Sequence, residues 1–222
     1  MIKFQRLHRI LERPLVAIVR ASDADVAEGI AEACVAGGIT ALEISLTTPR
    51  GLELIERLGQ RHAGRVIVGA GTVLDSETAR LAILAGAEFI LSPTLDLSMV
   101  RICSRYQVVS MPGVATPSEA VSAIEHGADI AKIFPGDAFG PAFIQAMRAP
   151  LPHLPFMPSG GVSLDNLGAW FESGAVAVGV GSSLSGPGLA GDLAAVESNA
   201  RAFVSALPRS RPENAAPSAR PG

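Results

Sequence analysis

The sequence predicts an α/β fold, a (β/α)8 or TIM barrel with one extra helix at the amino terminus, from three observations. Eight short apolar runs recur along the 222-residue chain. Segments with apolar residues at helical spacing separate these runs, so a strand and a helix repeat about every 20 to 27 residues, the size of a βα unit. The length agrees, because α/β barrels of this size form one domain. We therefore predict a single domain over residues 1–207.

The eight runs are mostly apolar without a regular alternation of polar residues, and they are rich in Val, Ile and Ala. Such continuity indicates parallel strands that are covered on both faces. In chain order the predicted strands are PLVAIVR (14–20), ITALEIS (39–45), RVIVGAGTV (65–73), AEFILSP (87–93), QVVSMPG (107–113), ADIAKIFP (128–135), LPFMPSGG (154–161) and AVAVGVGSS (175–183). A doubly wound open sheet is the alternative, but the first strand ends in VRASDAD without the glycine fingerprint of that fold.

The segments between the runs have ends that are typical of helices. Four of them span residues 23–38, 75–87, 116–128 and 163–175. Many begin at Asp, Ser or Thr, whose side chains accept hydrogen bonds from the free amides of a first helical turn. Many end at glycine, and we expect left-handed caps at four of these: Gly37, Gly86, Gly127 and Gly174.

The two ends of the chain differ in character. The residues before Pro14 predict an amphipathic helix that closes the bottom of the barrel, with these apolar residues on one side: Ile2, Phe4, Leu7, Ile10 and Leu11. From Pro208 the sequence is PRSRPENAAPSARPG, which is rich in Pro, Ser and Ala. This composition predicts a disordered tail over residues 208–222.

Charge and composition exclude several classes of partner. The net charge of -3 comes without a basic stripe, so we expect no binding to nucleic acid. No apolar run approaches the roughly 20 residues that span a bilayer, and the amino terminus lacks the features of a signal peptide. We expect a cytoplasmic protein without a membrane partner, in which Cys34 and Cys103 are buried free thiols.

Lys132 is one of only two lysines in the chain, the other being Lys3, and it lies between Ala131 and Ile133 in the sixth run. Apolar surroundings disfavour the charged ammonium, which lowers the pKa of the amine and frees it to attack a carbonyl. This is the requirement for Schiff-base chemistry. The structural alternative is a lysine that extends to the barrel rim or pairs with Glu43.

Glu43 lies between Leu42 and Ile44 in the second run. Because side chains alternate along a strand, Glu43 points into the barrel if its two neighbours pack against helices. A carboxylate in that position can act as a general acid and base. The structural alternative is a salt bridge to Arg20 or Lys132.

The seventh and eighth runs end in SGG and GVGSS. Glycines let a phosphate approach backbone amides, and the last two strands of such barrels commonly hold phosphate. We predict that the loops at these two strand ends bind a phosphate. Tight turns are the structural alternative.

Other strand ends should bind the rest of the substrate, since the active site of this fold lies at the carboxyl ends of the strands. The predicted substrate-binding residues are Arg20, Thr72, Pro93, Thr94, Phe134 and Ser159. Thr72 alone is weak evidence, because a threonine at a strand end often bonds its own loop. The histidines show no HxH or HExxH spacing, so we expect no histidine-bound metal: His8, His62, His126 and His153.

Six stretches, taken together in this order and spacing, resemble a known enzyme family: LEISLTTP, VGAGTVL, LSPTLD, PGVATPSEA, AKIFPGDAFGP and PSGGV. They are similar to the 2-keto-3-deoxy-6-phosphogluconate and 2-keto-3-deoxy-6-phosphogalactonate aldolases, and the resemblance extends from about Pro14 to about Leu207. It implies a (β/α)8 fold, a homotrimer, and cleavage through a lysine imine with no metal and no cofactor.

The resemblance also implies a role for each matching residue. Lys132 would form the imine and Glu43 would be the acid and base, while Arg20 and Thr72 would border the pyruvyl end. Four residues would face the phosphate: Gly160, Gly161, Gly181 and Ser182. Thr47 stands where the gluconate branch commonly has an arginine, and a small polar residue there is closer to the galactonate enzymes.

We therefore predict a Schiff-base aldolase, a carbon–carbon lyase of carbohydrate metabolism, that cleaves 2-dehydro-3-deoxy-6-phosphogalactonate to pyruvate and glyceraldehyde 3-phosphate. The alternatives within this class are the gluconate epimer and unphosphorylated 4-hydroxy-2-oxo acids such as 4-hydroxy-2-oxoglutarate. An alternative of another class is a non-catalytic barrel that binds a sugar phosphate as a sensor or scaffold. Phosphate binding alone needs neither Lys132 nor Glu43, which argues against the last alternative.

Overall fold

The computed structural model describes residues 1–208 of the chain. Its strands, in chain order, are β1 (Leu15–Val19), β2 (Ala41–Ser45), β3 (Ile67–Gly71), β4 (Phe89–Leu91), β5 (Val109–Met111), β6 (Gly113–Val114), β7 (Ala131–Ile133), β8 (Phe156–Pro158) and β9 (Val178–Val180). The predicted tail lies outside the described residues, apart from its first residue, Pro208.

Helices alternate with these strands. They are α1 (Ile2–Glu12), α2 (Ala24–Ala36), α3 (Gly51–Arg61), α4 (Ser76–Leu84), α5 (Leu97–Arg105), α6 (Pro117–Glu125), α7 (Gly136–Phe139), α8 (Pro141–Arg148), α9 (Leu167–Glu172), α10 (Ser182–Ser185), the 3-10 helix η1 (Gly186–Ala190) and α11 (Leu193–Ala206). Within residues 1–208, no helix combines the length and the apolar character that a membrane span requires.

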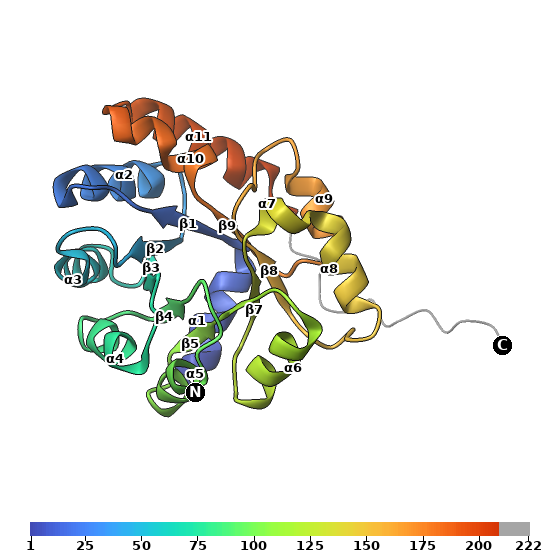
Figure 1. Ribbon diagram of the computed structural model, residues 1–222. Helices are drawn as coiled ribbons and strands as arrows, with labels where there is room; N and C mark the ends of the chain where they lie inside the picture. The colour runs from blue at the N-terminus through green and yellow to red at the C-terminus, as the bar shows by residue number, and fades with distance from the viewer. Residues whose placement is uncertain (209–222) are drawn as a thin grey trace.

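All strand pairs are parallel. The larger sheet has six strands in the order β5-β4-β3-β2-β1-β9, and the smaller has three in the order β6-β7-β8. A parallel bridge between Ser159 and Gly179 joins β8 to β9, and the Lys132 amide donates to the Pro112 carbonyl at 2.9 Å. Figure 1 shows the strands curled about a common centre with most helices outside them. The predicted parallel α/β architecture is confirmed.

The fifth predicted strand is divided into β5 and β6 at Pro112. Proline has no amide hydrogen to donate to a neighbouring strand, so the ladder is interrupted at that residue. The other seven predicted runs each contain one strand, and eight of the nine strands are buried at every position.

Apolar side chains pack in two layers. The outer cluster fills the space between strands and helices and includes Leu42, Ile44, Ala131 and Ile133. The inner cluster contains Val16, Ala41, Ile67, Phe89, Leu91, Val109, Met111, Ile130, Met157 and Ala177 from the strand segments, and Ile10 from α1. The strands are thus covered on both faces, as their continuous apolar sequence predicts.

Helix α1 closes the amino ends of the strands through only part of its predicted apolar side. Ile10 is fully buried in the inner cluster, and Leu7 packs against it. The other predicted members, Ile2, Phe4 and Leu11, are 53%, 61% and 39% exposed, so their predicted packing was wrong. A single helix can turn only a narrow stripe of side chains toward the barrel.

The helix starts follow the predicted capping chemistry. Asp23 accepts hydrogen bonds from two amides of the first turn of α2, and Asp75 and Thr116 each cap their helices through one amide. The predicted helix 163–175 begins later, at Leu167, because the Asn166 side chain accepts the Ser163 amide and holds a turn there.

Three of the predicted glycine caps have positive φ: Gly86, Gly127 and Gly174. The prediction for Gly37 was wrong, because its φ is -76° and the left-handed position is Gly38, with φ 97°. Gly37 is required for packing instead, since a Cβ atom there would lie 2.3 Å from the Ala200 Cβ of α11. Both cysteines are buried and unpaired, as predicted: Cys34 and Cys103.

Candidate active site

A cavity of about 300 Å³ lies where the carboxyl ends of β1, β2, β7, β8 and β9 meet. Nine residues predicted from the sequence line it: Arg20, Glu43, Lys132, Phe134, Ser159, Gly160, Gly161, Gly181 and Ser182. They come from segments far apart in the sequence and from both sheets. The parallel arrangement gathers them because it places all carboxyl ends at one edge.

Lys132 is the middle residue of β7 and is 4% exposed. Its neighbours Ala131 and Ile133 belong to the outer cluster, so the lysine side chain points to the opposite side, into the cavity. Its Nζ atom lies 5.1 Å from the centroid of the Phe134 ring. Among residues 1–208 it forms no ion pair within 4.0 Å, so the side chain does not extend to an exposed rim or to a paired carboxylate.

Glu43 is the middle residue of β2 and is 1% exposed. Its neighbours Leu42 and Ile44 pack in the outer cluster, and Glu43 lines the cavity, as the alternation predicts. Its Oε2 atom has no hydrogen-bond partner. Gly71 makes room for the carboxylate, because a Cβ atom at Gly71 would lie 1.6 Å from Glu43 Oε1.

Burial opposes charge on both groups. It lowers the pKa of Lys132 from the ordinary 10.5; the Glu43 carboxylate acts to raise that pKa, and the Arg20 cation lowers it further. Burial raises the pKa of Glu43 from the ordinary 4.5, against the opposing charges of Lys132 and Arg20. The cavity therefore shifts both groups toward their uncharged forms, an amine and a protonated carboxyl group. Such a pair can exchange protons with a bound carbonyl compound.

Arg20 follows β1 and is held by hydroxyl groups. Its Nε donates to Ser45 Oγ at 3.2 Å, and its Nη2 donates to Thr72 Oγ1 at 3.1 Å. Ser45 Oγ also lies 2.9 Å from both Thr47 Oγ1 and Thr72 Oγ1. Thr72 is not among the residues that line the cavity; its hydroxyl bonds Arg20, which does line it, and Ser45 at the end of β2.

The glycine-rich loops after β8 and β9 form one wall of the cavity. Gly160 and Gly161 have φ of 95° and 70°, values that glycine adopts without strain. The bridge between Ser159 and Gly179 holds the two loops side by side. With Gly181, this wall offers backbone without side chains, the surface a phosphate can approach, and Ser182 follows at the start of α10.

Pro93 and Thr94 do not line this cavity, so their predicted contact with substrate has no support here. The Thr94 carbonyl instead accepts the Gly113 amide at 3.2 Å, and the Thr94 amide donates to Ser92 Oγ at 3.1 Å. The first bond links the end of β4 to β6, and the second stabilises the turn that follows β4. Their contact with substrate stays a prediction that rests on their place at a strand end.

The cavity also has lining residues that the sequence did not single out: Ile18, Val162, Ser185, Gly186 and Leu189. Strand alternation could have found Ile18, because it lies two residues before Arg20 on the same face of the chain. Leu189 gave no such indication, since it lies in η1, a short segment without strand or helix periodicity. It is 59% exposed at the cavity rim.

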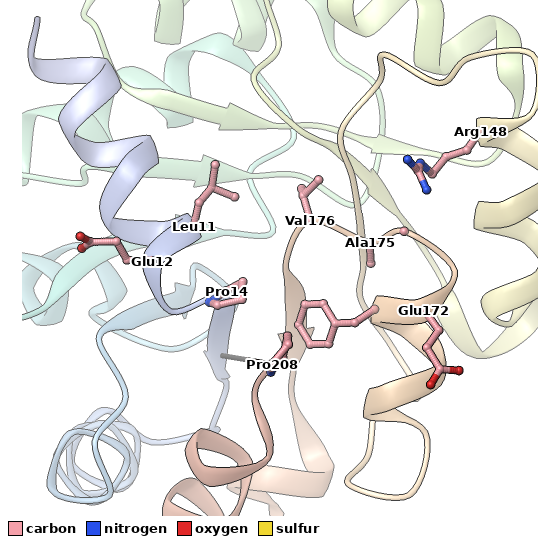
Figure 2. A pocket seen from close by; sticks show the side chains of 10 residues that line it. Leu11, Glu12, Pro14, Arg148, Glu172, Ala175, Val176 and Pro208 are labelled. Carbon is pink, nitrogen blue, oxygen red and sulfur yellow. The ribbon is translucent and has the colours of Figure 1, made fainter. Parts of the chain in front are cut away.

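A larger cavity of about 560 Å³ lies at the opposite end of the strands, beside the end of α1. Figure 2 shows Leu11, Pro14, Val176 and Pro208 around this space, with the carboxylates of Glu12 and Glu172 pointing away from it. It contains none of the predicted catalytic or binding residues. Chemistry, and not volume, therefore identifies the smaller cavity as the candidate active site. Within the described residues, no group of three or more His, Cys, Asp or Glu side chains is arranged to hold a metal ion.

Known proteins resemble this chain over most of its length. The model of the family described as KDPG and KHG aldolase matches residues 7–198. A probable 2-dehydro-3-deoxy-6-phosphogalactonate aldolase of Rhizobium meliloti (strain 1021) is 38% identical over 185 residues, which cover 82% of this chain and 87% of that protein. A 2-dehydro-3-deoxy-phosphogluconate aldolase of Pseudomonas aeruginosa is 42% identical over 155 residues, which cover 69% of each chain.

A solved structure described as native KDPGal shares the fold with a TM-score of 0.81 and 34% identity, covering 87% of this chain and 93% of that one. The matched segment 7–198 contains every residue that lines the smaller cavity. The sequence motifs, the curled parallel sheet and the match of the family model agree. The chain belongs to the KDPG and KHG aldolase family.

Proposed function

We propose that the protein cleaves 2-dehydro-3-deoxy-6-phosphogalactonate to pyruvate and glyceraldehyde 3-phosphate through an imine on Lys132. The observation that carries this proposal is a buried lysine and a buried, unpartnered carboxyl oxygen of Glu43 in one cavity. The substrate follows that of the relative from Rhizobium meliloti. The activity belongs to the carbon–carbon lyases.

The reaction begins at the C2 ketone of the substrate. Neutral Lys132 adds through Nζ to give a carbinolamine, and Glu43 transfers the protons that allow loss of water to a protonated imine. The lowered pKa of Lys132 supplies the neutral amine. The raised pKa of Glu43 lets its carboxyl group donate as well as accept a proton.

Bond cleavage uses the imine as an electron sink. Removal of the C4 hydroxyl proton, by Glu43 or by a water that it binds, breaks the C3–C4 bond and releases glyceraldehyde 3-phosphate. The bonding electrons pass to the imine and form an enamine. Protonation of the enamine at C3 and hydrolysis then release pyruvate and regenerate Lys132. No metal or cofactor takes part in this sequence of steps.

Binding of the two ends of the substrate supplies orientation. Arg20, held by Thr72, binds the carboxylate next to the ketone. The loops after β8 and β9 bind the phosphate through Gly160, Gly161, Gly181 and Ser182, while Phe134 and Ser159 contact the carbon chain between. Energy from these remote contacts can lower the barrier at C4.

The deciding experiment measures cleavage of the galactonate and gluconate 6-phosphates side by side, with their dephosphorylated forms as controls. We expect the galactonate epimer to have the larger kcat/KM, and loss of phosphate to lower it strongly. Faster cleavage of the gluconate epimer would support the second candidate, which the 42% identity to the Pseudomonas aeruginosa enzyme favours. Cleavage independent of phosphate would instead support a 4-hydroxy-2-oxo acid such as 4-hydroxy-2-oxoglutarate.

A sugar-phosphate sensor or scaffold is the alternative outside catalysis. It would bind these compounds without releasing pyruvate. A sensor has no use for a desolvated amine beside a carboxyl group, because burying both costs stability. Pyruvate release, followed with lactate dehydrogenase, separates the two functions.

We further propose that the two sheets form one closed (β/α)8 barrel within a single domain, residues 1–207, supported by the bonds of Ser159 with Gly179 and of Lys132 with Pro112. A cytoplasmic homotrimer remains the proposed assembly. Exposed apolar residues such as Leu81 and Leu84 on α4 offer a surface for it. Light scattering after size-exclusion chromatography tests this, and the mass of one chain would contradict it.

A further inference from the structure

Ser45, the last residue of β2, has a hydroxyl group that the catalytic steps do not use. Its side chain is 0% exposed, and it is not among the residues that line the cavity. Yet Ser45 Oγ lies within hydrogen-bond distance of three side-chain atoms: Arg20 Nε, Thr47 Oγ1 and Thr72 Oγ1. A buried hydroxyl at the centre of such a cluster fixes the positions of the groups around it.

The hydrogen-bonding capacity of Ser45 is fully used. A hydroxyl group has one hydrogen to donate and two lone pairs. One lone pair accepts from Arg20 Nε, which leaves the hydrogen and one lone pair for the two threonine hydroxyls at 2.9 Å. Ser45 therefore has no capacity left for substrate, and any role it has must act through its neighbours.

The same contacts determine which edge of the Arg20 guanidinium is free. Nε donates to Ser45 and Nη2 donates to Thr72, so the side edge of the guanidinium is occupied. Nη1 and the second hydrogen of Nη2 form the end edge, the pair of donors that matches a carboxylate. Arg20 lines the cavity, in which this edge is the one available to an anion.

Thr72 adds an independent observation. Its φ is 60°, a left-handed conformation that is rare for a β-branched residue. In this conformation its hydroxyl meets both Arg20 Nη2 at 3.1 Å and Ser45 Oγ at 2.9 Å. A strained residue whose side chain completes a cluster beside a reactive lysine indicates a functional requirement, since packing alone would favour glycine there.

We propose that Ser45 is a positioning residue that locks Arg20 and Thr72 into one preformed receptor for the carboxylate of the 2-oxo acid. The inference rests on the proposed aldolase function. Without the Ser45 hydroxyl, Arg20 loses its Nε partner, and as an exposed side chain it gains rotamers that turn the end edge away from the cavity. Substrate then binds less tightly, while the chemistry at Lys132 is unchanged once it is bound.

The experiment measures how imine formation depends on the carboxylate. Wild type and Ser45→Ala are incubated with increasing pyruvate and borohydride, and trapped protein is quantified by mass. The same titration is run with pyruvamide, which keeps the ketone but replaces the carboxylate by a neutral amide. We expect Ser45→Ala to need about tenfold more pyruvate for half-maximal trapping, the loss typical of one hydrogen bond to a charged group. With pyruvamide the two proteins should differ by less than about twofold.

Three further variants separate positioning from stability. Ser45→Thr keeps the hydroxyl, so its pyruvate concentration for half-maximal trapping should be close to that of wild type. Thr47→Ala removes only the outer contact of Ser45 and should have a smaller effect. Ser110→Ala removes another fully buried serine hydroxyl, which donates to Asp129 Oδ2 at 3.4 Å and does not line the cavity. It should leave the pyruvate dependence unchanged even if it lowers the melting temperature.

Steady-state kinetics complete the test. Ser45→Ala should raise KM for the phosphorylated substrate while kcat changes little, because it weakens binding of substrate and transition state alike. Equal loss with pyruvate and pyruvamide, or a fall in kcat at constant KM, would overturn the positioning role. If wild type cleaves substrate and Ser45→Ala shows the same pyruvate dependence as wild type, the positioning role is overturned while the proposed function stands. A wild type that neither cleaves substrate nor traps pyruvate would overturn the proposed function and this inference together.

Discussion

The two lysines of the chain lie at opposite ends of the strands and have opposite surroundings. Lys3, in α1, has its Nζ atom 2.9 Å from Asp129 Oδ2, and that carboxylate also accepts the Ser110 amide at 2.8 Å. Lys132 is more deeply buried, at 4% exposure, and has no ion pair within 4.0 Å among residues 1–208. Glu43, in the same cavity, keeps one carboxyl oxygen without a partner.

The difference shows how this fold separates stability from reactivity. At the amino end, opposite charges meet and hydrogen bonds satisfy them, so Lys3 fastens α1 under the strands. At the carboxyl end, burial without full pairing destabilises the charged states of Lys132 and Glu43, as the proposed imine chemistry requires. Variants at the two ends should therefore fail in different ways.

The largest expected effect is on turnover when the cavity lysine is removed. Lys132→Met should lower kcat by more than about 1,000-fold, because no other group at the site can form the imine. Lys3→Met should keep turnover near that of wild type. Pyruvate release in a coupled assay compares the two variants, and loss of turnover in Lys3→Met alone would reverse the assignment.

Glu43→Gln should have the next largest effect. The amide cannot accept and return a proton, so kcat should fall by about 100-fold or more. Imine trapping with pyruvate and borohydride should persist at a reduced rate, since Lys132 remains. An undiminished rate of substrate cleavage would move the acid and base role to another group.

Gly71→Ala tests the space that holds the Glu43 carboxylate. The new methyl group would lie 1.6 Å from Glu43 Oε1, so the carboxylate must move, and kcat should fall by about 100-fold. Gly59→Ala in α3 is the matched control, because nothing lies within 4 Å of its added methyl group. It should leave kcat unchanged and stabilise the helix by about 1 kcal/mol. Equal kinetics in both variants would contradict the assigned position of Glu43.

The smallest expected effects are on folding stability, and they have opposite signs at the two ends. Lys3→Met removes one member of a largely buried ion pair and should lower the free energy of unfolding by about 1–3 kcal/mol. Lys132→Met removes a desolvated amine and should raise it at neutral pH by about 1 kcal/mol. Urea titrations followed by circular dichroism measure both changes, and the same sign in both would contradict the comparison.

The pH dependence of that gain follows from linkage. The pKa of Lys132 is lower in the folded state than the ordinary 10.5, so between these two values the unfolded chain binds more protons. The contribution of Lys132 to wild-type stability therefore rises with pH across this window, and Lys132→Met lacks that contribution. The advantage of the variant should shrink as pH approaches 10.5, and a constant difference from neutral pH upward would mean that Lys132 is not desolvated.

Local sequence rules predicted much of this architecture, for identifiable reasons. Continuous apolar runs predicted parallel strands, strand alternation predicted that Glu43 points into the barrel, and the apolar neighbours of Lys132 predicted a desolvated amine. The division at Pro112 was missed although proline itself, which has no amide hydrogen to donate, could have indicated it. The shift from Gly37 to Gly38 was missed because it depends on the packing of Gly37 against Ala200 of α11. Contacts across strands, such as those of Ser45, leave no pattern in a single sequence.

The sequence also predicted most of the residues that line the candidate active site. Strand ends correctly suggested most of the lining residues, because parallel strands bring their carboxyl ends to one edge. The same rule also suggested Pro93 and Thr94, which do not line this cavity, since it does not say which strand ends surround Lys132. Leu189 was missed because η1 forms only in the context of the folded chain. Distance between strand ends is thus the information that the sequence lacks.

Borohydride reduction in the presence of pyruvate, followed by peptide mass spectrometry, tests the central claim most directly. The two lysines make the experiment internally controlled, because both are read in one sample. The account predicts a pyruvate-derived adduct on the peptide with Lys132 and none on the peptide with Lys3, with loss of activity in proportion to the adduct. An active enzyme whose Lys132 remains unmodified after this treatment would contradict it.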